Sequence, residues 1–161
     1  IIEGSTVTMK DGTTIDTSGI LFICCGAFHM VKPADMIAEL QGRLPVRVDL
    51  QSMTVADLKR ILTEPKFNIL QQQVALLATD KINVSFDASA VDAIAEVSAS
   101  VNASAQNTGA RRLATVLERV LDDISFDVEK YRETQVVVTA ALVKEKTKSL
   151  VSNVDLAKYL L

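Results

Sequence analysis

The sequence predicts an α/β segment followed by a mainly α-helical region with short β-strands. Ile20–Cys25 is continuously apolar and ends at Gly26, which is typical of a strand buried on both faces within a parallel sheet. From Ser52 onward, apolar residues recur mainly at helical spacing, and two short β-favouring segments interrupt them. One strand–helix–strand succession is too little for a doubly wound sheet, so we expect residues 1–50 to form part of one.

The first part is expected to contain a hairpin, a strand, a helix and a second strand. Lys10-Asp11-Gly12 is a turn sequence, Pro33 can open a helix, and Gly42 can end one. The expected elements are Ser5–Met9 paired with Thr13–Asp16, Ile20–Cys25, Pro33–Gln41 and Val46–Leu50. In open α/β sheets ligands bind at the carboxyl ends of the strands, so Cys25, Gly26 and Ala27 are expected near any active site.

The second part is expected to be mainly helical. Thr54 with Asp57 resembles a capping box, and Asp87 and Thr139 stand where helix N-caps are expected. The expected helices are Val55–Thr63, Phe67–Ala78, Ala88–Ala103, Gly109–Asp127 and Ala140–Val151, and the expected strands are Ile82–Phe86 and Gln135–Thr139.

Composition limits the size and the partners of the chain. The 161 residues are 48% hydrophobic and 23% charged, enough for one ordinary domain or two small ones. The net charge is −3 and no basic block occurs, so we expect no nucleic-acid partner and no binding to an anionic membrane. The longest apolar run is far shorter than the roughly 20 residues that a membrane-spanning helix needs.

The cysteines and the histidine predict no disulfide and no metal site. Cys24 and Cys25 are neighbours in a predicted strand, where they would point to opposite faces, so two buried thiols in a reducing compartment are expected. His29 is the only histidine, so no second histidine can share a metal ion with it, and we expect no metal role for it.

Arg111 and Arg112 lie at the predicted start of the helix Gly109–Asp127. A helix N-terminus carries partial positive charge, so an exposed cation there is unfavourable by about 0.3–1 kcal/mol. An anion at this place would be bound by helix amides and guanidinium together, which indicates a phosphate-sensing role. The alternative is that one arginine pairs with a carboxylate elsewhere while the other lies in solvent.

No self-contained catalytic motif is present. The sequence has no phosphate loop, no predicted strand ending in paired acids and no metal-ligand spacing, so the chain alone is not expected to be a catalyst. Arg43 lies in the segment Gln41–Pro45, predicted as a tight loop, and loops often carry functional groups. A surface or ion-paired arginine is the alternative there.

Four segments, in this order, resemble one family: Ile20–Phe28, Glu39–Val48, Ile61–Pro65 and Gly109–Leu113. They are similar to the C-terminal third of HslU (ClpY) ATPases, which are AAA+ unfoldases of the Clp/Hsp100 type. The resemblance extends to the last leucine, whereas the related ClpX unfoldases share the Gly-Ala-Phe and Gly-Ala-Arg segments but end differently.

The resemblance implies a division into three regions. Residues 1–50 would be the C-terminal part of the large α/β domain of an AAA+ P-loop NTPase, residues 51–153 its small helical domain, and residues 154–161 a peptidase-docking tail. The Walker A and Walker B segments, which hold ATP or ADP with Mg²⁺, would precede Ile1, so this chain alone is not expected to hydrolyse ATP or to hold nucleotide tightly.

The resemblance also implies roles for three charged residues. Arg43 corresponds to an arginine finger that acts on the nucleotide of the neighbouring subunit in a homo-hexameric ring, and Glu39 would help to position it. Arg111 corresponds to the sensor-2 arginine, which reaches the phosphates of its own subunit's ATP. Cys24-Cys25-Gly26 departs from the polar sensor-1 pattern of many AAA+ proteins, so no sensor-1 residue is assigned.

The tail Val154–Leu161 is implied to insert between subunits of the HslV (ClpQ) peptidase and to activate it, with Tyr159, Leu160 and Leu161 as anchors. Docking of the tail on its own domain is the alternative from the residues alone. The implied function is ATP-driven unfolding of proteins and their delivery to the peptidase under stress, in the bacterial cytoplasm or the mitochondrial matrix. Two hypotheses compete with it: a docking or regulatory module without turnover, and a ClpX-like fragment.

Overall fold

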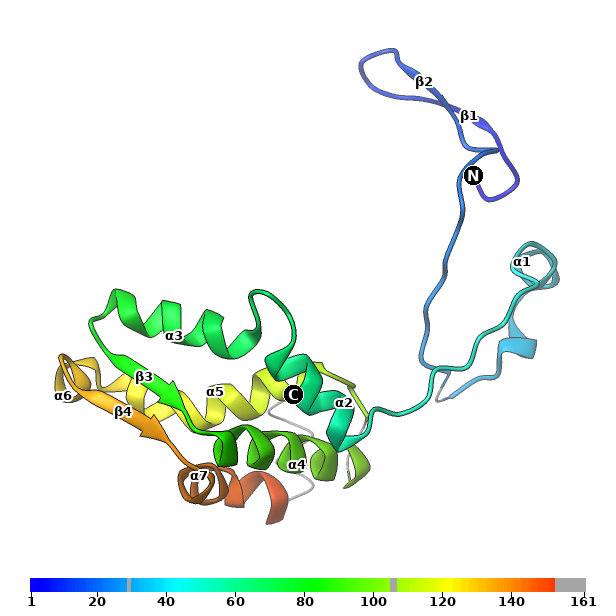
Figure 1. The fold of residues 1–161 in the computed structure, drawn as a ribbon. Coiled ribbons are helices and arrows are strands. Elements are labelled where there is room, and N and C mark those ends of the chain that lie inside the picture. Colours follow the sequence, from blue (N-terminus) through cyan, green and yellow to red (C-terminus); the bar gives the residue numbers. More distant parts are fainter. Residues whose placement is uncertain (29, 105–106, 153–161) are drawn as a thin grey trace. The chain divides into compact units, whose positions relative to one another are not determined.

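Two units make up the chain, Ile1–Leu50 and Gln51–Leu161, in a computed structural model that describes residues 1–28, 30–104 and 107–152 (Figure 1). His29 and the tail Val154–Leu161 with its three predicted anchors lie outside the described residues.

The first unit carries a hairpin and two short helical segments. Strand β1 (Thr6–Thr8) pairs antiparallel with β2 (Thr14–Asp16), so the predicted hairpin is confirmed. Its turn contains Gly12 at a φ of +85°, a conformation that glycine adopts without strain. The helical segments are the 3₁₀ turn η1 (Pro33–Asp35) and helix α1 (Ala38–Arg43).

The predicted helix Pro33–Gln41 is wrong in its continuity and in its end. Met36 has an extended backbone with ψ of 152°, and this separates η1 from α1. Gly42 lies inside α1 rather than after it, and Arg43 is therefore the last helical residue instead of a loop residue.

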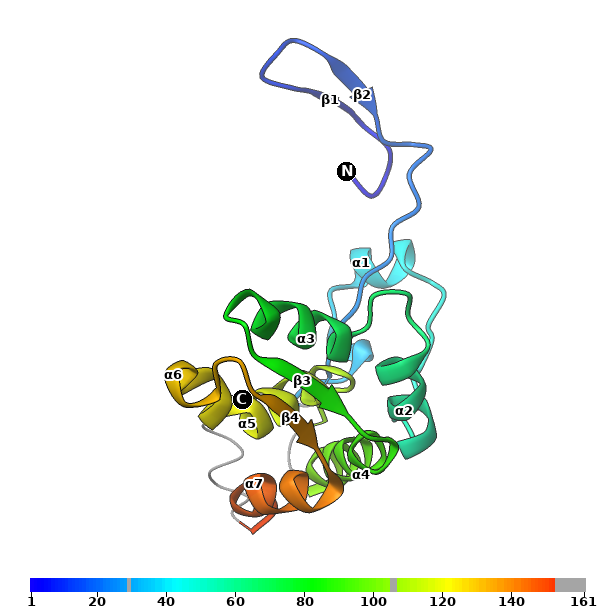
Figure 2. The ribbon, with the colours of Figure 1, turned by 60° about the vertical axis from the view of Figure 1, so that its left-hand side comes forward.

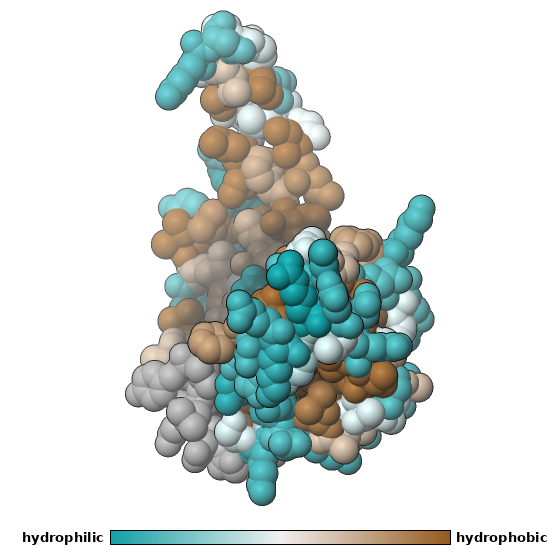
Figure 3. Space-filling view, turned by 90° about the vertical axis from the view of Figure 1, so that its left-hand side faces the viewer, coloured by the Kyte–Doolittle hydropathy of each residue, from teal (hydrophilic) through white to brown (hydrophobic). Residues whose placement is uncertain are grey.

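The strands predicted at Ile20–Cys25 and Val46–Leu50 are also wrong: neither segment is paired into a sheet. Their apolar side chains are uncovered, with Leu21 83% and Leu50 89% exposed. Figure 3 shows many hydrophobic side chains at the surface of this unit. A strand needs a hydrogen-bonded neighbour and a covered face, and the described part of the first unit supplies neither to these segments.

The cysteine prediction fails for the same reason. Cys24 and Cys25 are both exposed free thiols, not buried ones. Because no sheet edge forms there, the structure does not support an active site around Cys25, Gly26 and Ala27.

The second unit consists of helices around a parallel pair of strands (Figures 1 and 2). Strands β3 and β4 pair in register with Val84 opposite Val136, and the helices between them in sequence form the crossover that a parallel pair requires. The elements are α2 (Val55–Thr63), α3 (Ile69–Thr79), β3 (Asn83–Phe86), α4 (Ala88–Ser104), α5 (Arg111–Phe126), α6 (Val128–Tyr131), β4 (Gln135–Val138) and α7 (Ala140–Ser152).

The hydrophobic core of this unit is centred on α4, which packs against α2, α5 and α7. The predicted apolar stripe of α5 is confirmed, since each of its residues is at most 4% exposed. The stripe consists of Leu113, Val116, Leu117, Val120, Leu121 and Ile124. Burial of such a stripe, rather than helix propensity, supplies most of the stability of a helix of this length.

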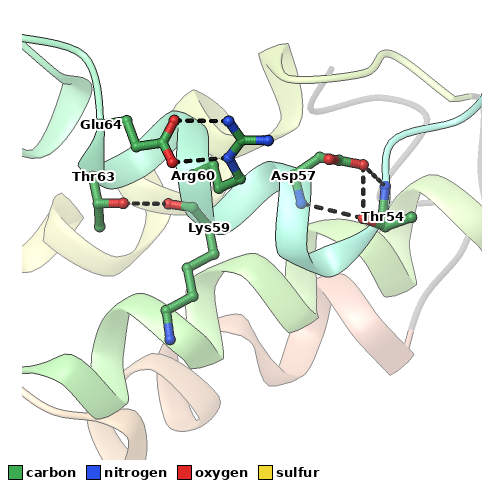
Figure 4. Close-up of polar contacts among 6 residues, drawn as sticks. All are labelled: Thr54, Asp57, Lys59, Arg60, Thr63 and Glu64. Carbon is green, nitrogen blue, oxygen red and sulfur yellow. Dashed lines mark hydrogen bonds and ion pairs between the residues drawn. The ribbon is translucent and has the colours of Figure 1, made fainter.

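The predicted N-caps are confirmed. The Thr54 hydroxyl accepts a hydrogen bond from the Asp57 amide at 3.2 Å, and the Asp57 carboxylate accepts from the Thr54 amide at 3.0 Å (Figure 4). Asp87 accepts from the Ala90 amide at 2.6 Å and thereby caps α4. Thr139 caps α7 with a longer contact of 3.5 Å from the Leu142 amide.

The capping box at the start of α2 is expected to make the stability of the chain depend on pH. The hydrogen bond from the Thr54 side chain is the main reason that the pKa of Asp57 lies below its usual 3.8. A carboxylate with a lowered folded-state pKa adds stability above about pH 4, and this is lost as the pH falls through the folded value. We expect Asp57→Asn to lower the urea midpoint at pH 7 and to lose most of that difference near pH 2. An equal difference at both pH values would contradict the prediction.

The buried hydroxyl of Ser98 is expected to lower the stability of the chain. Ser98 is fully buried in α4, and within the described part of the chain its hydroxyl has no hydrogen-bond partner. Removing an unsatisfied buried polar group is favourable, so we expect Ser98→Ala to stabilise the chain by about 1 kcal/mol in urea unfolding. Ser100→Ala, at an exposed position of the same helix, controls for the propensity gain of about 0.5 kcal/mol. A smaller effect at Ser98 than at Ser100 would overturn the expectation.

Candidate functional site

The candidate site is the start of α5. Arg111 is the first residue of this helix and its side chain is exposed. Ala110 occupies the N-cap position, and no side chain there caps the first amide groups. An exposed guanidinium beside a helix start without a side-chain cap is suited to an anion, because both the amides and the arginine fork donate hydrogen bonds to oxygen atoms.

Arg112 behaves differently from its neighbour. Its side chain is only 1% exposed, and burial lowers its pKa below the usual value. Its Nε donates to the Asn102 side-chain oxygen at 3.2 Å. The alternative considered from the sequence had one arginine in solvent, and Arg111 is exposed as that alternative expects. The bond from Arg112 to Asn102 goes to a neutral amide.

The burial of Arg112 was not predicted from the sequence, although its helical spacing from the apolar residues of α5 indicates it. Arg112 stands four residues before Val116 and eight before Val120, so it lies on the buried face of α5 beside Leu113, at the start of the stripe. The stem of an arginine can be buried along apolar surface, so a charged residue in a stripe does not mark the exposed face by itself.

Asn102 is the second residue that the sequence did not reveal. Besides the bond from Arg112, its side-chain oxygen accepts from the Thr108 amide at 3.3 Å, and its Nδ2 donates to the Gly109 carbonyl at 3.0 Å. Asn102 comes from α4, so three bonds from one side chain connect α4 to the residues that flank Arg111. Nothing in its sequence surroundings distinguishes it from an ordinary polar helix residue.

Gly109 lies two residues before Arg111, the first residue of α5. Its φ is +64°, a left-handed conformation that other residues adopt at a cost. The Asn107 side chain accepts from the Gly109 amide at 2.9 Å and donates to the Ser52 hydroxyl at 3.0 Å. The loop before Arg111 is thus held by side chains from both its own segment and the start of the second unit.

Glu39 and Arg43 lie together on α1, four residues apart, and both are exposed. The Arg43 guanidinium forms an ion pair with Glu3 of the same unit. Glu39 and Arg43 belong to the first unit and Arg111 to the second, so each is described within its own unit.

The described part of the chain offers neither a metal-binding cluster nor a membrane-spanning helix. Over residues 1–28, 30–104 and 107–152, no group of three or more His, Cys, Asp or Glu side chains is arranged to hold a metal ion. In the same residues no helix is both long enough and apolar enough to cross a membrane.

Comparison with known proteins gives consistent results. Residues 1–47 match the family model described as AAA domain (Cdc48 subfamily). The whole chain is 57% identical to the ATP-dependent protease ATPase subunit HslU2 of Trypanosoma brucei brucei and covers 32% of it. It is 52% identical to the HslU subunit of a Methylobacterium species and 48% identical to that of Hyphomonas neptunium, covering 37% of each. The chain therefore spans about a third of the length of these curated relatives.

Proposed function

Because the chain belongs to the HslU family of ATPase subunits, we propose that it provides the nucleotide-responsive arginines and the peptidase-docking tail of such a subunit. The observation that carries the proposal is Arg111, exposed on the first turn of α5 in a chain similar over its whole length to ATPase subunits. In this proposal the full-length subunit that contains this chain couples ATP hydrolysis to the unfolding of protein substrates, and it delivers them to an HslV-type peptidase.

In this proposal Arg111 reads the nucleotide of its own subunit. Its guanidinium donates to phosphate oxygens, and the positive end of α5 adds to the attraction. Since Arg111 belongs to the second unit, contact with nucleotide bound elsewhere in the subunit would connect that unit to the rest. Hydrolysis would then change the relative positions of the domains.

Arg43 is proposed to act across a subunit boundary in a homo-hexameric ring. A planar guanidinium placed at the transferred phosphoryl group stabilises the charge that develops there. Its present ion pair with Glu3 is partly exposed, at 41% for the Arg43 side chain, and exposed ion pairs contribute little free energy. Arg43 can therefore leave Glu3 for a phosphate at small cost, and Glu39 on the same helix is proposed to help position it.

ATP and ADP with Mg²⁺ are the proposed cofactors of the full-length subunit. The start of α5 fits a phosphate anion, as its exposed arginine and uncapped first turn indicate. Mg²⁺, when bound, would neutralise phosphate charge, and we assign none of the described residues to hold it. A compartment that keeps thiols reduced, the bacterial cytoplasm or the mitochondrial matrix, suits the exposed neighbours Cys24 and Cys25.

The tail is proposed to activate the peptidase, and this makes a prediction that needs no ATPase activity. A synthetic peptide of residues 154–161 is expected to stimulate cleavage of a fluorogenic peptide by a purified HslV-type peptidase. Tyr159, Leu160 and Leu161 would supply buried apolar anchors, and one short tail would bind weakly, so high peptide concentrations are needed.

Two variant peptides give the test its control. Replacing Leu160 and Leu161 by serine should abolish the stimulation, whereas replacing Val154 by serine at the other end should leave most of it. If the unmodified peptide at saturation does not stimulate cleavage, the docking role is wrong, and a tail packed on its own domain becomes the better explanation.

A further inference from the structure

We propose that Asn102 is a positioning residue for Arg111: it fixes the start of α5 so that the exposed arginine is presented to a phosphate in one orientation. The inference rests on the proposed nucleotide-reading role of Arg111. Asn102 itself touches no ligand in this proposal and acts only through the backbone and the neighbouring arginine.

The hydrogen bonds of Asn102 lie on both sides of Arg111. Its side chain bonds to Thr108 and Gly109 on one side of Arg111 and to Arg112 on the other, at 3.3, 3.0 and 3.2 Å. The chain is thereby held before and after Arg111 by a single side chain.

Asn107 also holds Gly109, through the Gly109 amide, but Asn102 is the side chain whose bonds lie on both sides of Arg111. Ala110 offers no side-chain cap, and the first helical bond, from the Arg112 amide to the Gly109 carbonyl, is long at 3.4 Å. The Leu113 amide bonds to the Ala110 carbonyl at 3.0 Å, so the turn tightens only after Arg111. The bonds from α4 therefore add to those of Asn107 in holding this helix start.

Helix α4 gives Asn102 a firm support. It packs against α2, α5 and α7, and the residue before Asn102, Val101, is 2% exposed. Functional groups are held most accurately when their supporting residues are anchored on packed elements, and displacement by about 1 Å can cost two orders of magnitude in rate.

The side-chain amide of Asn102 suits this role because it can both donate and accept hydrogen bonds. An asparagine side chain both donates to the Gly109 carbonyl and accepts from an amide and a guanidinium, whereas aspartate has no donor for the carbonyl. Asn102→Asp therefore keeps the bonds to Thr108 and Arg112 but opposes the Gly109 carbonyl, and Asn102→Ala removes all three.

The test uses the full-length ATPase subunit that contains this chain, with a fluorescent ATP analogue as probe. Asn102→Ala is expected to raise the Kd of the analogue about tenfold, and Asn102→Asp to raise it less. Asn68→Ala is the matched control. Asn68 is another mostly buried asparagine, which caps α3 by accepting from the Gln71 amide at 2.9 Å. Its loss should lower the thermal midpoint to a similar degree and leave the Kd unchanged.

A double variant separates positioning from general stability. If Asn102 acts through Arg111, adding Asn102→Ala to Arg111→Ala should change the Kd no further. Independent effects that multiply in the double variant, or a Kd in Asn102→Ala equal to that of the unmodified subunit, would overturn the proposal. Failure of the proposed function is seen separately, because Arg111→Ala alone would then leave the Kd unchanged.

Discussion

Replacing Arg43 by alanine in the full-length subunit is expected to reduce ATP hydrolysis by about three orders of magnitude while nucleotide still binds. The large effect follows from the proposed place of the guanidinium, where it would meet charge that is present only in the transition state. Steady-state hydrolysis and equilibrium binding of a fluorescent ATP analogue, measured on the same preparation, check the two halves of this expectation.

Arg47→Ala is the matched control for Arg43. Arg47 is another exposed arginine of the first unit, and its Nη2 donates to the Gln41 side chain at 3.1 Å. Its replacement should leave hydrolysis close to that of the unmodified subunit. Ordinary turnover in Arg43→Ala, or an equal loss in both variants, would show that Arg43 is no more than a surface ion-pair partner of Glu3.

Arg111→Ala is expected to weaken nucleotide binding about ten- to hundredfold, the effect of losing hydrogen bonds from a charged donor to phosphate. Arg111→Lys should recover part of the affinity, because lysine keeps the charge but loses the planar fork of donors. The measurement is the Kd of the ATP analogue, with the thermal midpoint as a check that the subunit remains folded.

Arg119→Ala provides the comparison on the same helix. Arg119 is exposed on α5 and pairs with Asp122 at 2.8 Å, two turns beyond Arg111. Its loss is expected to leave the Kd unchanged. An affinity that is the same in Arg111→Ala as in the unmodified subunit would remove the basis for a phosphate-reading role.

The second unit was largely predictable from the sequence because its signals are local. The apolar stripe of α5 and the caps Thr54, Asp87 and Thr139 each depend on residues within a few turns of one another. Helix boundaries accordingly agree with expectation to within two residues, as for α5 at Arg111–Phe126. The parallel pairing of β3 with β4 was not predicted, because pairing joins segments far apart in the chain.

The first unit was less predictable because strands depend on distant partners. Ile20–Cys25 has the composition of a buried strand, yet a composition does not provide the neighbouring strand or the covering layer. At the candidate site, the conflict of Arg111 and Arg112 with the helix dipole pointed to the start of α5, and the family resemblance favoured Arg111 of the two. The role of Asn102 could not be identified in advance, because its bonds reach residues six to ten positions away across a loop.

The uncovered segments of the first unit affect how the chain behaves at high concentration. Val46–Leu50 carries Arg47 and Asp49 between its apolar residues, and such charges discourage association of strand with strand. Ile20–Cys25 has neither charge nor proline, and a short, uncharged segment rich in β-favouring residues is the kind that stacks with copies of itself. Of the two segments, Ile20–Cys25 is therefore where aggregation of the isolated chain would begin.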